Sequence, residues 1–409
     1  MDTMIARAAG IDVHQATMVV TVRVPAGEGH QRVETQTFGA TSAELVGLRD
    51  WLEAHGVTHV ALESTGVYWR PLYYLLEETF TLVLVNMKHL AHVPGRKSDV
   101  RDSEWLAQLL ACGLLRGSLV PPAPIRDLRD LTRYRKRQVD DRTQEVNRLH
   151  RTLEDAGLKL ATVMSDILGV SGRAMLAALL DGSTDVVAIA DLARGRLRRK
   201  LPALQAALQG RLRPHQAFLV AEILAKIDYL EEMLERLTAE VDRHLAPFEP
   251  ALANLLTIPG VGRTTATTLV AETSGDMSRF PSAAHLCSWA GMCPGQDESA
   301  GKRRRGKTRN GNKFLRTALV EAAWAATHTK QTALRARYYR IKRQRGHKRA
   351  LVAVGHQILE IAYYILRDGV THQELGAQYY DQRQRDRTLR RNVKQLEALG
   401  FVVTLTPAA

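Results

Sequence analysis

Cysteine is scarce in this sequence, and long apolar runs are absent. Cys112, Cys287 and Cys293 are the three cysteines among 409 residues, and no two of them form a Cys-x-x-Cys pair. This spacing argues against a disulfide framework and suits a reducing cytosol. No apolar run approaches the roughly 20 residues that span a bilayer, and the N-terminus carries no signal-peptide pattern. We therefore expect a soluble cytoplasmic protein with no membrane partner.

Acidic residues are few relative to basic ones. The chain has 43 Asp and Glu against 57 Lys and Arg, which gives a formal net charge of +14. Such an excess of positive charge indicates a polyanionic partner, most simply nucleic acid. The hydrophobic fraction of 45% is ordinary for a globular protein, and the length is enough for two or three domains.

The first third of the chain has the pattern of an α/β domain. Apolar residues from 8 to 24, interrupted by "HQAT", predict a two-stranded hairpin, and alternation over residues 31–38 predicts a third strand. Helix, strand, helix, strand and helix patterns then follow, at about residues 41–56, 57–65, 69–78, 81–86 and 98–110. This order is typical of a ribonuclease-H-like fold, although other α/β folds share parts of it.

Four acidic residues lie at the ends of these elements. Asp12 interrupts the first strand in "GIDVH", Glu63 ends the fourth in "ALESTG", and Asp99 and Asp102 begin the last helix. Clustered carboxylates repel one another, and oxygen ligands with no His or Cys nearby favour Mg²⁺ or Mn²⁺. Two such ions about 3.5–4 Å apart can promote cleavage of a phosphodiester. The alternatives are an edge strand or turn cap for Asp12 and a helix cap for the Asp pair.

The middle of the chain is helical and basic. After "PPAP", residues 126–151 predict one long helix, whose Arg133 and Arg137 either contact phosphates or belong to a solvated face. Further on, six apolar residues alternate by four and three, which suits an antiparallel helix pair or a coiled-coil dimer contact. They are Ile223, Ile227, Leu230, Leu234, Leu237 and Val241.

Two later stretches indicate contact with nucleic acid. "LLTIPGVGRTTATTLVAE", residues 255–272, predicts a helix–hairpin–helix whose Gly260 and Gly262 allow close approach to a phosphate. Residues 297–349 contain 17 Lys and Arg against 3 Asp and Glu, so the positive field is concentrated there. The candidate phosphate contacts in this stretch are Lys302, Arg303, Arg304, Arg305, Lys307, Arg309, Lys313 and Arg316.

Ser299 lies beside this basic run, in the Gly-flanked sequence "GQDESAG". A phosphate would be drawn toward it, but an isolated serine in a loop is most often structural. No Ser-His-Asp pattern surrounds it, so acyl transfer has no support. From the residues alone, Ser299 is only a candidate.

Taken together and in order, the motifs resemble the DEDD insertion-sequence transposases, the bridge-RNA-guided "one-ten" family. They span about residues 8–370 and read "GIDVH", "ALESTG", "KSDVRDSEWLAQLL", "IPGVG", "AGMCPGQDESAG" and "TRNGNKFLR". The resemblance implies that Asp12, Glu63, Asp99 and Asp102 are the catalytic metal ligands and that Ser299 is the nucleophile. In the family a glycine commonly follows the serine directly, whereas here Ala300 intervenes.

The resemblance also implies a division of the chain into domains. Residues 1–122 would form a RuvC-like, ribonuclease-H-like α/β domain, and residues 123–250 a basic helical coiled-coil region. Residues 251–370 would form a helical transposase domain that includes the helix–hairpin–helix and the serine. Residues 371–409 read as a basic amphipathic helix and a short strand, with no role assigned.

By resemblance, the activity is RNA-guided cleavage and rejoining of DNA through a covalent phosphoserine, with a Mg²⁺- or Mn²⁺-dependent acidic site. The partners would be donor and target DNA, a non-coding bridge RNA and further copies of the chain, as a dimer that becomes a tetramer in the synaptic complex of a prokaryotic cell. The alternatives are a metal-dependent Holliday-junction resolvase or nuclease, a DNA invertase of the same family, and a non-catalytic nucleic-acid-binding protein.

Overall fold

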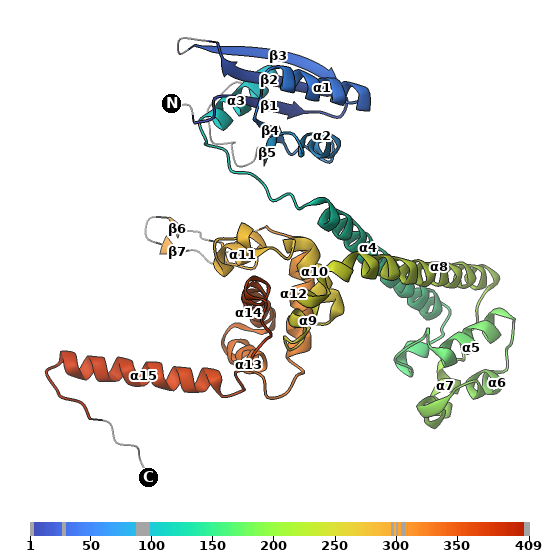
Figure 1. Cartoon of the computed structure of the whole chain (residues 1–409). Coiled ribbons are helices and arrows are strands. Elements are labelled where there is room, and N and C mark those ends of the chain that lie inside the picture. Colours follow the sequence, from blue (N-terminus) through green and yellow to red (C-terminus); the bar gives the residue numbers. More distant parts are fainter. Residues whose placement is uncertain are drawn as a thin grey trace. The chain divides into compact units, whose positions relative to one another are not determined.

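The computed structural model describes residues 4–26, 30–86, 99–295, 298–299, 302–303, 308 and 310–404. The chain divides into two compact units, Met1–Val120 and Pro121–Ala409 (Figure 1). Each unit is described by itself.

The N-terminal unit contains a mixed five-stranded sheet with the strand order β3-β2-β1-β4-β5. The first three strands form an antiparallel meander, and β4 and β5 continue the sheet parallel to β1. The predicted strands are therefore confirmed. Their bounds are Ala8–Val13 for β1, Thr17–Pro25 for β2, Gln31–Gly39 for β3, His59–Glu63 for β4 and Thr81–Val85 for β5.

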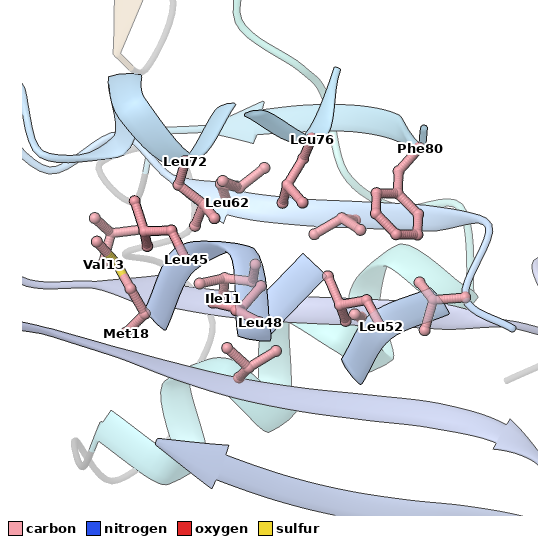
Figure 2. Close-up of a cluster of buried hydrophobic side chains, with 14 of the residues drawn as sticks. Ile11, Val13, Met18, Leu45, Leu48, Leu52, Leu62, Leu72, Leu76 and Phe80 are labelled. Carbon is pink, nitrogen blue, oxygen red and sulfur yellow. The ribbon is translucent and has the colours of Figure 1, made fainter. Parts of the chain in front are cut away.

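Helices cover both faces of this sheet. Helices α1 (Ser42–Ala54) and α2 (Trp69–Leu76) bury leucines spaced three and four residues apart against one face, in a core that includes Ile11 and Val13 of β1 (Figure 2). Helix α3 (Asp99–Ala111) packs on the opposite face. Because side chains alternate along a strand, Gly10 and Asp12 of β1 lie on the α3 side.

The C-terminal unit begins with two long helices that pack side by side. They run antiparallel, since Lys226 of the second donates to Glu145 of the first at 2.5 Å, while Arg135 of the first donates to Thr238 of the second at 2.9 Å. The apolar seam predicted over 223–241 therefore lies within an antiparallel pair. The bounds are Ala123–Asp155 for α4 and Pro214–Leu245 for α8.

Short helices adjoin this pair at both of its ends (Figure 1). Between α4 and α8 the chain forms α5 (Val170–Leu180), α6 (Val186–Asp191) and α7 (Leu201–Ala207), which share a core with the end of α4. After α8, helix α14 packs against α9, α11, α12 and α13, while α10 contacts α4 and α12. The bounds are Glu249–Leu256 for α9, Arg263–Thr273 for α10, Ala283–Trp289 for α11, Lys313–Ala326 for α12, Ala333–Arg345 for α13 and His347–Asp368 for α14.

The predicted amphipathic helix near the C-terminus is α15 (Tyr379–Ala398). The short strand predicted after it is wrong for residues 401–404, which have no strand conformation. A strand needs a neighbouring strand to accept its hydrogen bonds, and none in the described part of the chain pairs with these residues. None of the described helices is long and apolar enough to cross a bilayer.

Candidate functional site

Asp12 and Glu63 meet at one edge of the central sheet. The two residues lie on neighbouring parallel strands, with Ile11 of β1 aligned with Leu62 of β4. The Asp12 residue is 3% exposed. Burial, and then a hydrogen bond with the Asp12 carboxyl, raise the pKa of Glu63 above its usual range. The Glu63 carboxyl therefore loses its proton less readily than an isolated glutamate.

His14 is a third polar residue of this edge. Its Nε2 lies 3.1 Å from Oδ2 of Asp12. The premise that no histidine lies near the acids is wrong, because His14 directly follows β1 and its imidazole lies beside Asp12. The sequence "GIDVH" already contained this signal.

Helix α3 approaches β1 closely over Gly10. A Cβ atom on Gly10 would lie 2.3 Å from the carbonyl oxygen of Ser103, so no larger residue fits there. Ser103 also forms a hydrogen bond of 2.8 Å with Thr21 of β2. The C-terminal end of α3 lies near the start of β1, since the Met4 and Ile5 amides donate to the Ala111 carbonyl. The N-terminal end of α3 consequently lies toward the Asp12 end of the strand.

This arrangement brings the first turn of α3 toward the edge that holds Asp12 and Glu63. Asp102 is half-buried and directly precedes Ser103. Asp99 is the first residue of α3, and its side chain lies outside the described part of the structure. Among the described side chains, no three His, Cys, Asp or Glu lie close enough together to hold a metal ion.

The donor chemistry of the edge fits a divalent metal. Asp12 is buried and Glu63 is half-buried, so two ionised carboxylates here would repel each other, and a cation between them would offset this repulsion. Carboxylate oxygens are the ligands that Mg²⁺ and Mn²⁺ prefer. Asp12 and Glu63 are the carboxylates of this edge that such an ion would contact, and Asp102 and Asp99 of the adjacent helix stay predicted ligands.

Ser299 lies in the C-terminal unit, on a two-stranded hairpin between α11 and α12. Strands β6 (Glu298–Ser299) and β7 (Lys302–Arg303) pair antiparallel, with Ser299 opposite Lys302, and we call them the serine hairpin. Pro294 and Thr308 form a further bridge. The structure does not describe the side chains of the serine hairpin, and Arg304, Arg305, Lys307 and Arg309 lie outside the described residues.

The segment that carries the serine hairpin begins and ends at points in close backbone contact, near Ala290 and Gly311. A Cβ atom on Gly311 would lie 2.4 Å from the backbone of Ala290 and Gly291. Immediately afterwards, Lys313 is exposed and Arg316 is half-buried on the first turn of α12. Both remain candidates for phosphate contact.

The predicted helix–hairpin–helix consists of α9, a turn and α10. Gly260 in the turn has a φ of +86°, and a Cβ atom there would lie 2.4 Å from the Ala322 carbonyl oxygen. Gly260 is therefore needed for packing against α12. Gly262 precedes α10, is exposed and has open space around it. The phosphate contact predicted for this turn stays a prediction.

The two arginines proposed on α4 differ in their surroundings. Arg137 is exposed. Arg133 donates from Nε and Nη2 to the two carboxylate oxygens of Glu272, both at 2.7 Å. The sequence pattern did not identify Glu272, because its partners lie 139 residues away on α4 and 40 residues away before α12. A phosphate contact by Arg133 would compete with this ion pair.

Comparison with known proteins relates both units to one family. A model of the DEDD domain of IS110 elements, described as a transposase, matches residues 9–157, which include all four predicted acids. A model described as the transposase IS116/IS110/IS902 family matches residues 252–339, which include Ser299.

Curated relatives give the same result. An insertion element IS110 uncharacterized 43.6 kDa protein from Streptomyces coelicolor is 32% identical over 160 residues, 38% of each chain. The putative transposase y4rJ of Sinorhizobium fredii is 28% identical over 56% of this chain and 54% of its own length. The putative transposase y4pF/y4sB of the same organism is 25% identical over 78% of this chain and 76% of its own. The chain thus covers less than two thirds of the first two relatives.

The chain belongs to the IS110 family of insertion-sequence transposases. The resemblance to this family found in the sequence is therefore confirmed. A DEDD transposase domain also implies dependence on a divalent metal in general.

Proposed function

We propose that this protein is an RNA-guided DNA transposase that cleaves and rejoins DNA strands through a covalent phosphoserine intermediate. The observation that carries the proposal is the placement of the buried Asp12 and of Glu63 at the same end of neighbouring parallel strands of a ribonuclease-H-like sheet, in a chain that both family models match. Donor and target DNA are the substrates, and a non-coding RNA selects the sites by base pairing. The protein then recognises mainly backbone and helical shape.

The acidic edge is the metal-dependent half of the site. Asp12, Glu63, Asp99 and Asp102 hold Mg²⁺ or Mn²⁺, and His14, 3.1 Å from Asp12, keeps that carboxylate in place. When bound, the metal stabilises negative charge that develops at the scissile phosphodiester.

Ser299 is the covalent half of the site. Its Oγ attacks the phosphorus atom, so the Oγ–P bond forms while the bond from phosphorus to the departing strand end breaks. The serine proton passes to a base, and the departing oxygen gains a proton. Attack by the hydroxyl of another strand end reverses these changes and restores the serine. The acids of one protomer act with the serine of another, in a dimer that becomes a tetramer when the DNA ends are brought together.

Basic residues of the C-terminal unit hold the nucleic-acid backbone. Lys313 and Arg316 lie on the first turn of α12, which follows the segment that carries the serine hairpin, and Arg137 is exposed on α4. The other proposed contacts are Arg133, Gly260, Gly262, Lys302, Arg303, Arg304, Arg305, Lys307 and Arg309.

The experiment that tests this function detects a protein–DNA adduct on a denaturing gel. Ser299→Ala should keep DNA and RNA binding but yield no adduct, while the control Ser288→Ala should keep both. Mixing Ser299→Ala with Asp12→Asn protein should restore some cleavage, because one hybrid site then has an intact serine and intact acids.

Other outcomes would support the alternatives. Metal-dependent cleavage by Ser299→Ala would indicate a junction resolvase or nuclease that uses water. Binding without any cleavage by the wild-type protein, with its RNA and metal present, would indicate a non-catalytic binder. An invertase shares the chemistry and would be recognised by inverted rather than inserted products.

A further inference from the structure

Glu272 is a buried acidic residue that the proposed chemistry does not use. It lies at the C-terminal end of α10, and its side chain is 1% exposed. A buried carboxylate is costly unless it is paired and hydrogen-bonded. Its partners come from two other elements of the C-terminal unit, and each partner has a defined place in the chain.

The first set of partners lies on α4. Arg133 binds both carboxylate oxygens of Glu272 at 2.7 Å, and its guanidinium lies 5.0 Å from the centre of the Phe314 ring. Arg129 donates to the backbone carbonyls of Ala271 and Glu272 at 3.0 and 2.8 Å. A bidentate pair with a second arginine beside it fixes position and orientation together.

The other partner is Asn312. Its Nδ2 donates to Oε2 of Glu272 at 2.5 Å, while its Oδ1 accepts the Leu315 amide at 3.1 Å and so caps α12. Asn312 follows Gly311, whose backbone is pressed against Ala290 and Gly291. The carboxylate is therefore tied to the point at which the segment that carries the serine hairpin joins α12.

The contacts of Glu272 thus join α4 to Asn312, where the segment that carries the serine hairpin ends, and we call this point the base of the serine hairpin. Helix α4 begins at Ala123, shortly after Val120 ends the unit that contains Asp12 and Glu63. It is thus the first helix of the C-terminal unit, and through Arg133 and Glu272 it is connected to Asn312.

We propose that Glu272 is a positioning residue, which fixes the base of the serine hairpin relative to α4 by binding Arg133 and Asn312 at once. The inference rests on the proposed function, because positioning matters for catalysis only if Ser299 is the nucleophile. A displacement of about 1 Å at a reacting group can cost about 100-fold in rate.

Two variants test this role, with one control. Glu272→Gln removes the charge that binds Arg133. In Asn312→Ser the serine side chain can still cap α12 but is too short to reach Glu272. This variant therefore removes the contact with Glu272 without removing the helix cap that stabilises α12. Glu321→Gln, an exposed residue of α12, is the matched control.

Two measurements are made on each variant. In the free protein, amide hydrogen exchange over residues 310–316 should become at least about 10-fold faster in both test variants and stay unchanged in the control. At saturating DNA and RNA, adduct formation per folded molecule should fall about 10- to 100-fold, with a change in Kd of less than about threefold.

The results separate positioning from stability and from the proposed function itself. Unchanged exchange over 310–316 in both variants would overturn the inference, as would faster exchange with a wild-type rate of adduct formation. If the melting temperature and the binding affinity fall in proportion to adduct formation, Glu272 is merely structural and the inference is overturned. If the wild-type protein forms no adduct, the proposed function fails, while the exchange data still decide whether Glu272 fixes the hairpin base.

Discussion

Two buried carboxylate sites in this protein differ in how their charge is compensated. Glu272 meets Arg133, Arg129 and Asn312, so the chain itself supplies its cations and donors. Asp12 instead meets a potential cation, the His14 imidazole at 3.1 Å, and another carboxyl group, that of Glu63, whose pKa is raised by burial and by this neighbour. A compensated acid holds the fold together, whereas an acid pair is costly without a cation. The comparison distinguishes a carboxylate that fixes neighbouring elements from one that is kept for metal binding.

The largest effect should come from removing a charge at the acidic edge. Asp12→Asn should reduce DNA cleavage by about three orders of magnitude or more, because a metal ligand is lost, while folding and nucleic-acid binding remain. Gel assays of strand cleavage measure this, with the exposed Asp50→Asn as control. Cleavage that survives Asp12→Asn, or excess chelator, would show that the metal assignment is wrong.

At Glu272, truncation of the side chain should affect stability as well as adduct formation. Glu272→Ala leaves two arginines without their buried partner, and the free energy of unfolding of the C-terminal unit should fall by about 3–5 kcal/mol. Denaturant unfolding should show no comparable loss for Asp12→Asn. Equal losses in both variants would break the distinction between the two sites.

The basic run beside the serine hairpin should affect the salt dependence of binding. Replacing Arg303, Arg304 and Arg305 by Ala should reduce the slope of log affinity against log salt by about 0.9 for each lost contact with duplex DNA. Binding titrations at several salt concentrations measure the slope. If the slope does not change, the run is a solvated loop.

The smallest effect concerns pH. Because the pKa of Glu63 is raised, the folded metal-free protein binds more protons than the unfolded chain above the ordinary value of 4.5. Its free energy of unfolding should therefore decrease as the pH rises from 4.5 through the raised pKa of Glu63, and Mg²⁺ should offset the decrease. Thermal unfolding across this range measures both, and Asp12→Asn should flatten the profile. Stability that rises with pH there in the metal-free wild-type protein would contradict the raised pKa.

Local patterns predicted most of the elements but few of the contacts between them. Alternating strands and leucine spacing predicted the sheet and helices around Asp12, and Gly10 allows the close approach of α3. The Glu272 contacts with Arg133 and Asn312 join residues far apart in sequence, and no periodicity encodes such pairs. The turn sequence predicts a phosphate contact at Gly260, but it does not reveal that the Ala322 backbone also requires a residue without a side chain there.

The central claim is tested most directly by mapping the protein–DNA adduct. Wild-type protein is incubated with Mg²⁺, RNA and a labelled DNA substrate, digested with protease and analysed by mass spectrometry. The labelled nucleotide should be attached to Ser299, and it should be absent from Asp12→Asn protein. A label on Ser288, Ser282 or any other residue, or metal-dependent cleavage with no adduct, would contradict the account.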